Sequence, residues 1–235
     1  MPADTPVPFF ALAPGAHCAT MADMTHAARP PLAMRLALCA VLALPVAASA
    51  FTVNINPGSR AIYLQVGNGS FTGTYSGGGT PGNNATVNKV SVTVPAAQVG
   101  SGTAQQMSSD STQATSFYDN YTFCNPPVQV YIGGFYRNTG TTGTATLSVT
   151  TSSANLANAS GDTIPFTQIS WTSSGNGDTG AEPIPAGSFT GGTQTLASFP
   201  VNTWRESCHT FTYANSASVA AGTYTGRATY TLSAP

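Results

Sequence analysis

The stretch GTYTGRATYTLSAP (222–235) carries the alternation that decides the fold class of this chain. Its even-numbered positions from 224 to 232 hold Tyr224, Gly226, Ala228, Tyr230 and Leu232, and its odd-numbered positions from 225 to 233 hold only Thr, Arg and Ser. Successive side chains of a β-strand point to opposite faces. This period of two therefore predicts a half-buried strand with its Tyr and Leu side chains turned inward.

Similar alternation recurs along the chain, separated by segments rich in Gly, Asn and Ser, which favour turns. The alternating segments are FTVNI (51–55), AIYLQV (61–66), VSVTV (90–94), VQVYI (128–132), TATLSVT (144–150), FTQISWT (166–172) and TWRESCHTFTY (203–213). Beyond residue 50, no window of eleven or more residues shows a convincing helical period. The pattern predicts an all-β fold: a single antiparallel, immunoglobulin-like β-sandwich of about 8–10 short strands.

The N-terminal part predicts export from the cytoplasm. Arg35 precedes the apolar run LALCAVLALPVAASA (36–50), which ends in an A-x-A pattern. A basic start, a short apolar core and small residues at the end are typical of a secretory signal peptide, here cleaved before Phe51. The run is shorter than the roughly 20 residues that span a bilayer, so we expect no membrane span in the mature chain.

These features divide the chain into a leader with signal peptide (1–50) and a secreted β-sandwich domain (51–235). Signal peptides typically have about 15–30 residues, so we expect translation to start at Met24 or Met34. The expected location is the periplasm, the cell surface or the extracellular space.

The charge of the mature chain argues against nucleic acid as a partner. Five Lys and Arg stand against six Asp and Glu, a net charge of 5 − 6 = −1, with no basic run. Nucleic acid binding requires several cationic side chains on one face. Charged residues make up 6% of the whole chain, against roughly a quarter in an average soluble protein. This composition suits an exported β protein whose outward faces are uncharged but polar.

Two cysteines, Cys124 and Cys208, follow the predicted cleavage site. An isolated pair in an exported protein most simply forms one disulfide. The alternative is a metal site that joins both thiols to His209, but the neighbouring sequence supplies no fourth ligand. We therefore predict the disulfide and no metal.

Catalytic motifs are absent from the sequence, and we expect neither an enzyme nor a cofactor. His209 is the single histidine after residue 50, and no nucleophile elbow or zinc-protease motif accompanies it. The acidic residues are scattered and give no support to the carboxylate pair of a glycosidase. The segment GNGDTGAE (175–182) could offer oxygen ligands to Ca²⁺. It lacks acidic residues at alternate positions, however, so a plain hairpin connection is the preferred interpretation.

The longest irregular stretch, 95–127, ends in the aromatic run SFYDNYTFC, and long loops of this kind are often functional. Exposed aromatic rings could stack on a sugar or a partner protein. The candidates are Tyr118, Tyr121, Tyr131, Phe135, Tyr136 and Trp204. Among them Tyr118 and Tyr121 are the predicted ligand-binding residues. The competing interpretation is that Trp171 and Trp204 fill the space between two sheets; it is favoured for Trp171, and the choice between binding and packing stays open for Tyr118 and Tyr121.

The end of the chain also resembles known families. Gly222-Thr223-Tyr224 resembles the tyrosine corner of immunoglobulin-like sandwiches, where a Tyr bonds back to the preceding chain. AGTYTG followed by an alternating strand looks like the ends of bacterial fimbrial and spore-coat-U-like pilin subunits. The spacing of Tyr224, Tyr230-Thr231-Leu232 and Pro235 is similar to that of WxL surface domains, with Tyr230 at the position of their Trp. The resemblance implies a surface-displayed β protein without catalysis.

The leading functional hypothesis is thus a non-catalytic, secreted or cell-surface structural and adhesion protein of bacterial fimbrial type, with like subunits or other surface proteins as partners. The alternative is an extracellular or periplasmic module that binds carbohydrate. In either case we expect the last strand to pair with the Cys208 strand through the loop ANSASVAAG (214–222).

Overall fold

The structure is a computed structural model that describes residues 52–82 and 87–235. The predicted leader, its signal peptide and the cleavage site before Phe51 lie outside the described residues. Among the described residues, no helix is long and apolar enough to cross a membrane.

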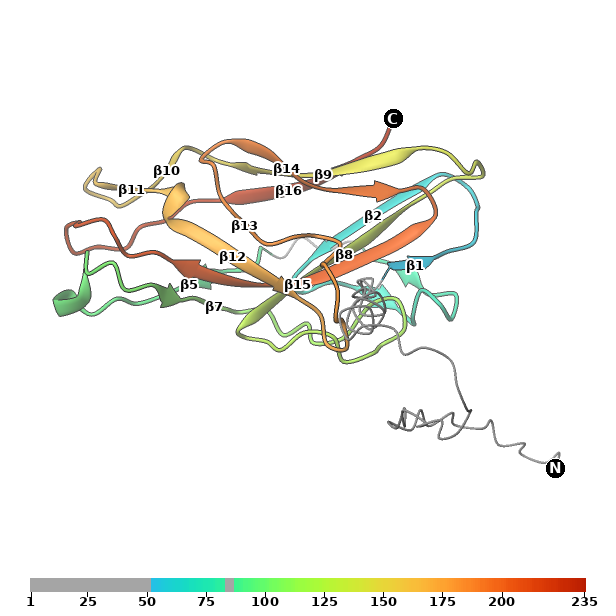
Figure 1. Cartoon of the computed structure of the whole chain (residues 1–235), viewed down its shortest axis with the longest axis horizontal. Helices are drawn as coiled ribbons and strands as arrows, with labels where there is room; N and C mark the ends of the chain where they lie inside the picture. Colours follow the sequence, from blue (N-terminus) through green and yellow to red (C-terminus); the bar gives the residue numbers. More distant parts are fainter. Residues whose placement is uncertain (1–51, 83–86) are drawn as a thin grey trace, which may run out of the picture. The chain divides into compact units, whose positions relative to one another are not determined.

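Almost all regular structure in the described residues is β (Figure 1). The longer strands are β2 (Ala61–Val66), β8 (Gln129–Arg137), β9 (Thr144–Thr151), β12 (Ile169–Ser174), β14 (Thr193–Pro200), β15 (Thr203–Tyr213) and β16 (Ala228–Ser233). The shorter strands are β1 (Thr52–Asn54), β3 (Phe71–Thr72), β4 (Thr80–Pro81), β5 (Val90–Ser91), β6 (Gln105–Gln106), β7 (Ser108–Ser109), β10 (Asn155–Ala157), β11 (Thr163–Pro165) and β13 (Gly187–Ser188). Within residues 52–82 and 87–235, two single turns of 3₁₀ helix, η2 (Ala96–Gln98) and η3 (Phe166–Gln168), interrupt the strands.

Two larger sheets organise these strands. The first has the order β13-β12-β15-β8-β2, and β1 and β6 also pair with β15. The second has the order β14-β9-β16. All pairings are antiparallel, and β3–β4, β5–β7 and β10–β11 form separate two-stranded ladders. The prediction of an antiparallel all-β fold is confirmed. The strands are nevertheless distributed over five sheets rather than the two of one simple sandwich.

Apolar side chains fill the space between the two larger sheets. We call this set the inner core; it comprises Met107, Val130, Ile132, Tyr136, Ala145, Leu147, Val149, Ile164, Phe166, Ile169, Trp171, Ile184, Phe189, Ala197, Phe199, Val201, Phe211 and Tyr213. Figure 1 shows β14, β9 and β16 on one side of β12, β15, β8 and β2. Side chains from both sheets meet there, as Val149 of β9 and Trp171 of β12 do.

A second cluster covers the opposite face of the first sheet. We call it the outer cluster: Ile55, Tyr63, Phe117, Phe123, Cys124, Tyr131, Phe135, Trp204 and Cys208. Irregular chain supplies part of it, including Phe117 and Phe123. This arrangement explains why β8 and β15 are buried along nearly their whole length. Their alternate side chains face two different apolar environments, as neighbouring Val130 and Tyr131 do.

The partner predicted for the last strand is wrong. β16 pairs with β9, with Leu232 opposite Leu147, and not with the Cys208 strand β15. The chain after β15 therefore crosses to the other sheet instead of turning back as a hairpin. The alternation itself is confirmed, because Tyr230 and Leu232 are half-buried in β16 and Thr231 between them is exposed.

Tyr224 makes the bond predicted from its resemblance to a tyrosine corner. Its hydroxyl donates a hydrogen bond to the backbone carbonyl of Ala220, at 2.8 Å. The bond spans four residues and ties together the segment that leads from one sheet to the other.

Candidate functional site

The disulfide predicted between Cys124 and Cys208 is present, with the two Cα atoms 5.6 Å apart. Cys124 ends the aromatic loop that covers the first sheet, and Cys208 lies in the middle of β15 on the same face. The bond therefore fastens the loop to the sheet next to Phe123.

The loop from residue 114 to 124 turns back on itself in front of that bond. An isolated bridge pairs Thr115 with Thr122, and the amide of Ser116 donates to the carbonyl of Tyr121 at 2.8 Å. At the tip, Asp119 Oδ1 accepts a hydrogen bond from the Tyr121 amide at 2.9 Å, and Asn120 adopts a positive φ of 66°. This tight turn presents the Tyr121 side chain outward, where it is 52% exposed.

A second turn, at residues 175–178, packs against the first. The Asn176 amide donates to the Phe123 carbonyl at 3.1 Å, and Asn176 Nδ2 donates to the Thr122 carbonyl at 2.8 Å. Gly175 permits this close approach, since a Cβ atom there would lie 2.6 Å from the Phe123 ring. The two turns are thereby joined side by side.

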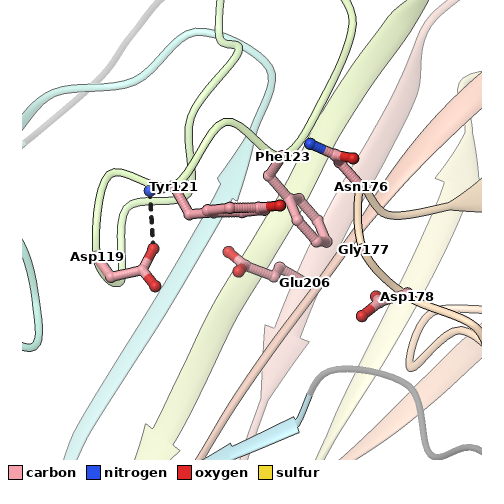
Figure 2. Close-up of a pocket in the computed structure, with 7 residues that line it drawn as sticks. All are labelled: Asp119, Tyr121, Phe123, Asn176, Gly177, Asp178 and Glu206. Atoms are coloured by element: carbon pink, nitrogen blue, oxygen red, sulfur yellow. Dashed lines mark hydrogen bonds between the residues drawn. The ribbon is translucent and has the colours of Figure 1, made fainter. Parts of the chain in front are cut away.

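A pocket of about 270 Å³ lies between these turns and β15 (Figure 2). Its lining residues are Asp119, Tyr121, Phe123, Asn176, Gly177, Asp178 and Glu206. Figure 2 shows the Tyr121 ring above the Glu206 carboxylate, with Asp119 and Asp178 on either side in that view. Glu206 is completely buried, whereas Asp119 and Tyr121 are exposed at the rim.

Three donors hold one oxygen of Glu206. Its Oε2 accepts hydrogen bonds from Ser116 Oγ at 2.8 Å, Tyr131 Oη at 2.6 Å and Trp204 Nε1 at 2.9 Å. Its Oε1 is buried and has no hydrogen-bond partner within the described structure. Burial raises the pKa of Glu206, and the three donors partly offset that rise.

Tyr131 and Gly133 shape the floor around this carboxylate. Burial and the nearby Glu206 raise the pKa of Tyr131 well above its ordinary value, so its hydroxyl stays protonated and donates. Gly133 stands opposite Glu206 in the β8–β15 register. A Cβ atom at Gly133 would lie 2.2 Å from the Tyr131 hydroxyl, so a glycine leaves room for the Tyr131–Glu206 bond.

The predicted aromatic residues separate into two groups. Tyr121 lines the pocket. Tyr118 is half-buried and lies outside the lining, stacked on Tyr75 with ring centroids 6.2 Å apart and packed on Trp204 at 5.7 Å. The interpretation of the other four as exposed platforms is wrong, because at most 3% of each side chain is accessible; they are Tyr131, Phe135, Tyr136 and Trp204. Trp171 is buried in the inner core, as predicted.

His209 is buried away from the pocket, on the inner face of β15. Its ring stacks on Trp171 at a centroid distance of 5.7 Å, and Nε2 lies 3.2 Å from the Ile184 carbonyl oxygen. Burial lowers the pKa of His209 to about 4. The ring is thus a neutral core residue at physiological pH. In the part of the chain that the structure describes, no three or more His, Cys, Asp or Glu side chains are arranged to hold a metal ion.

Glu206 is the buried polar residue among the pocket residues that sequence reasoning missed. In TWRESCHTFTY it occupies the same face as Trp204 and Cys208, two residues to either side. A carboxylate between a Trp and a half-cystine on one strand face indicates a buried charge, and buried charges need a structural or functional reason.

Comparison with known proteins gives no relatives from which to transfer a function: no family model, no curated protein and no solved structure matches this chain.

Proposed function

We propose that this protein is a non-catalytic carbohydrate-binding module, exported from the cytoplasm, cleaved before Phe51 and built on an immunoglobulin-like β-sandwich. The observation that carries the proposal is the pocket beside Tyr121, in which an exposed aromatic ring stands over fixed hydrogen-bonding groups. Protein sites for sugars need such a pair of features: an apolar ring face for the C–H side of the sugar, and polar groups for its hydroxyls.

The polar groups of the pocket are suited to hydroxyl donors. Glu206 Oε1 is a buried acceptor without a partner in the described structure, and the exposed Asp119 and the half-buried Asp178 also line the pocket. The volume of about 270 Å³ is close to the lower limit of small-molecule sites, which supports recognition of a single sugar ring at a time.

The test is binding of purified residues 51–235 to an array of oligosaccharides, followed by calorimetry on any positive glycan. Tyr121→Ala should abolish binding, because it removes the stacking face without touching the floor. Ile62→Ala is the matched control: Ile62 is also an exposed apolar side chain, 42% accessible, but lies on β2 outside the pocket. Binding unaffected by Tyr121→Ala, or no binding to any glycan, would refute the proposal.

A second candidate function, a fimbrial-type structural subunit at the cell surface, is favoured by β16. Within the described residues β16 pairs only with β9 and so forms an edge of its sheet. An edge strand offers unpaired backbone groups to a strand from another chain. Heat-labile, SDS-resistant oligomers of the exported protein would support this function, and a strictly monomeric protein would contradict it.

A further inference from the structure

The side chains around the pocket carry one sign of charge. Three of its seven lining residues are acidic, namely Asp119, Asp178 and Glu206, and none is Lys or Arg. Opposite charges attract more strongly in a partly enclosed site than in bulk water. An anionic sugar would therefore be repelled, whereas a ligand with a positive group would be attracted.

The floor of the pocket shows where that positive group would bind. Glu206 is fully buried, and its Oε2 already accepts from Ser116, Tyr131 and Trp204. These bonds fix the carboxylate and leave Oε1, which is buried without a hydrogen-bond partner in the described structure. A buried acceptor left unpaired is costly. An ammonium group supplies both the missing donor and the compensating charge.

The Tyr121 ring distinguishes a sugar from a simple cation. Tyr121 and Glu206 line the same pocket, and in the view of Figure 2 the ring is drawn above the carboxylate. A sugar bound in this pocket would therefore meet an aromatic ring as well as a carboxylate. An aromatic face attracts both sugar C–H groups and cations.

We propose that this pocket prefers an amino sugar with a free primary ammonium group to the N-acetylated form of the same sugar. The ammonium contacts Glu206 Oε1, and the negative charges of Asp119 and Asp178, which also line the pocket, add to the attraction. This inference rests on the proposed carbohydrate-binding function, and it adds the chemical class of the ligand.

The test compares two probes that differ at one group, a tetramer of β-1,4-linked glucosamine and its fully N-acetylated counterpart, by calorimetry at mildly acidic pH, where the sugar amines are protonated, and at low ionic strength. The glucosamine tetramer should bind at least ten-fold more tightly. Asp119→Asn should reduce this preference by several-fold with little effect on folding, since Asp119 is exposed at the rim. Glu206→Gln should remove the preference and leave weak binding of both probes.

The outcomes separate the inference from the function on which it rests. Equal affinity for the two tetramers, or tighter binding of the acetylated one, would overturn the amino-sugar preference and leave carbohydrate binding intact. No binding of either tetramer or of any other glycan would overturn both. Binding of a lysine-rich peptide in place of the sugars would show that the pocket takes cationic protein side chains, which also contradicts the proposal. A preference that is unchanged in both Asp119→Asn and Glu206→Gln would exclude these carboxylates as its cause and overturn the inference.

Discussion

The two faces of β15 are covered in different ways, although the same eleven residues form both. On the inner face, His209, Phe211 and Tyr213 meet side chains from neighbouring strands and the second sheet. On the outer face, Trp204, Glu206 and Cys208 meet loops of irregular chain held by a disulfide. Sheet packing buries His209, Phe211 and Tyr213 on the inner face, whereas the loops leave a pocket over one buried carboxylate on the outer face. Irregular chain over a sheet face therefore leaves room for a pocket where a second sheet would not.

Glu206 on the outer face and His209 on the inner face are both buried and titratable, with opposite consequences for stability. Burial raises the pKa of Glu206 and lowers that of His209, because it disfavours the charged form of both. Glu206 thus contributes stability that is present at low pH and lost as the pH rises through its raised pKa. His209 lowers the stability of the fold as the pH falls below about 6.5, the ordinary pKa of histidine in the unfolded chain. Below that pH the unfolded chain takes up a proton on His209 that the folded chain does not.

The largest expected effect concerns the loops of the outer face. The double variant Cys124→Ser, Cys208→Ser should lose about 4–5 kcal/mol of unfolding free energy, because the disulfide closes a loop across 84 residues of sequence. The loss should be uneven. In hydrogen exchange, the Tyr75 and Ser76 amides, which bond to the carbonyls of Phe117 and Tyr118, should lose protection before the amides of β9. A uniform loss over both faces would show that the loops are not a separate layer.

The second effect concerns His209 on the inner face. With a folded pKa of about 4 and an unfolded value near 6.5, protonation should reduce stability by about 3 kcal/mol at pH 4 relative to pH 7. Urea unfolding at pH 7, 5.5 and 4 measures how the unfolding free energy changes with pH. His209→Phe should remove the part of this change that comes from His209. Glu206→Gln is the matching variant on the other face and should change the pH dependence in the opposite direction. An identical slope in wild type and His209→Phe would mean that the ring titrates normally.

A third, smaller effect tests the alternation in β16. Leu232→Asp should cost about 2 kcal/mol, since the half-buried Leu232 packs against the inner core and an aspartate there would be partly desolvated. Thr231→Asp, on the exposed side of the same strand, should change stability by less than about 0.5 kcal/mol. Melting curves of the two variants make the comparison. Equal effects would contradict the assignment of the two faces.

The sequence predicts which segments are strands better than it predicts how they pair. The alternation in TWRESCHTFTY coincides with β15, and the alternation at the end of the chain predicts the inward side chains of β16. A period of two determines which side chains share a face, but it does not determine which strand lies alongside. The pairing of β16 with β9 could therefore not be predicted from the pattern.

Strand β14 was missed for a different physical reason. Its pairing with β9 has a register shift between Thr195 and Ala197, and such a bulge interrupts the period of two. Of the pocket, the sequence predicted Tyr121, as an aromatic residue in a long loop. It did not predict that the turn at 175–178 would pack beside that loop, because the contact joins segments more than fifty residues apart.

The smallest expected change in stability is at Tyr121. This variant distinguishes a residue that contacts a ligand from a residue that holds the loop on the sheet. Half of this side chain is accessible to solvent, whereas Phe123, two residues later on the same loop, is 3% exposed. Tyr121→Ala should therefore alter the unfolding free energy by less than about 0.5 kcal/mol, the range typical of surface substitutions, while it abolishes glycan binding. Chemical unfolding and calorimetry on the same preparation give both quantities. A loss of more than about 1 kcal/mol would place Tyr121 among the residues that hold the loop on the sheet, and a loss of binding would then follow from a disturbed pocket rather than from a missing ring.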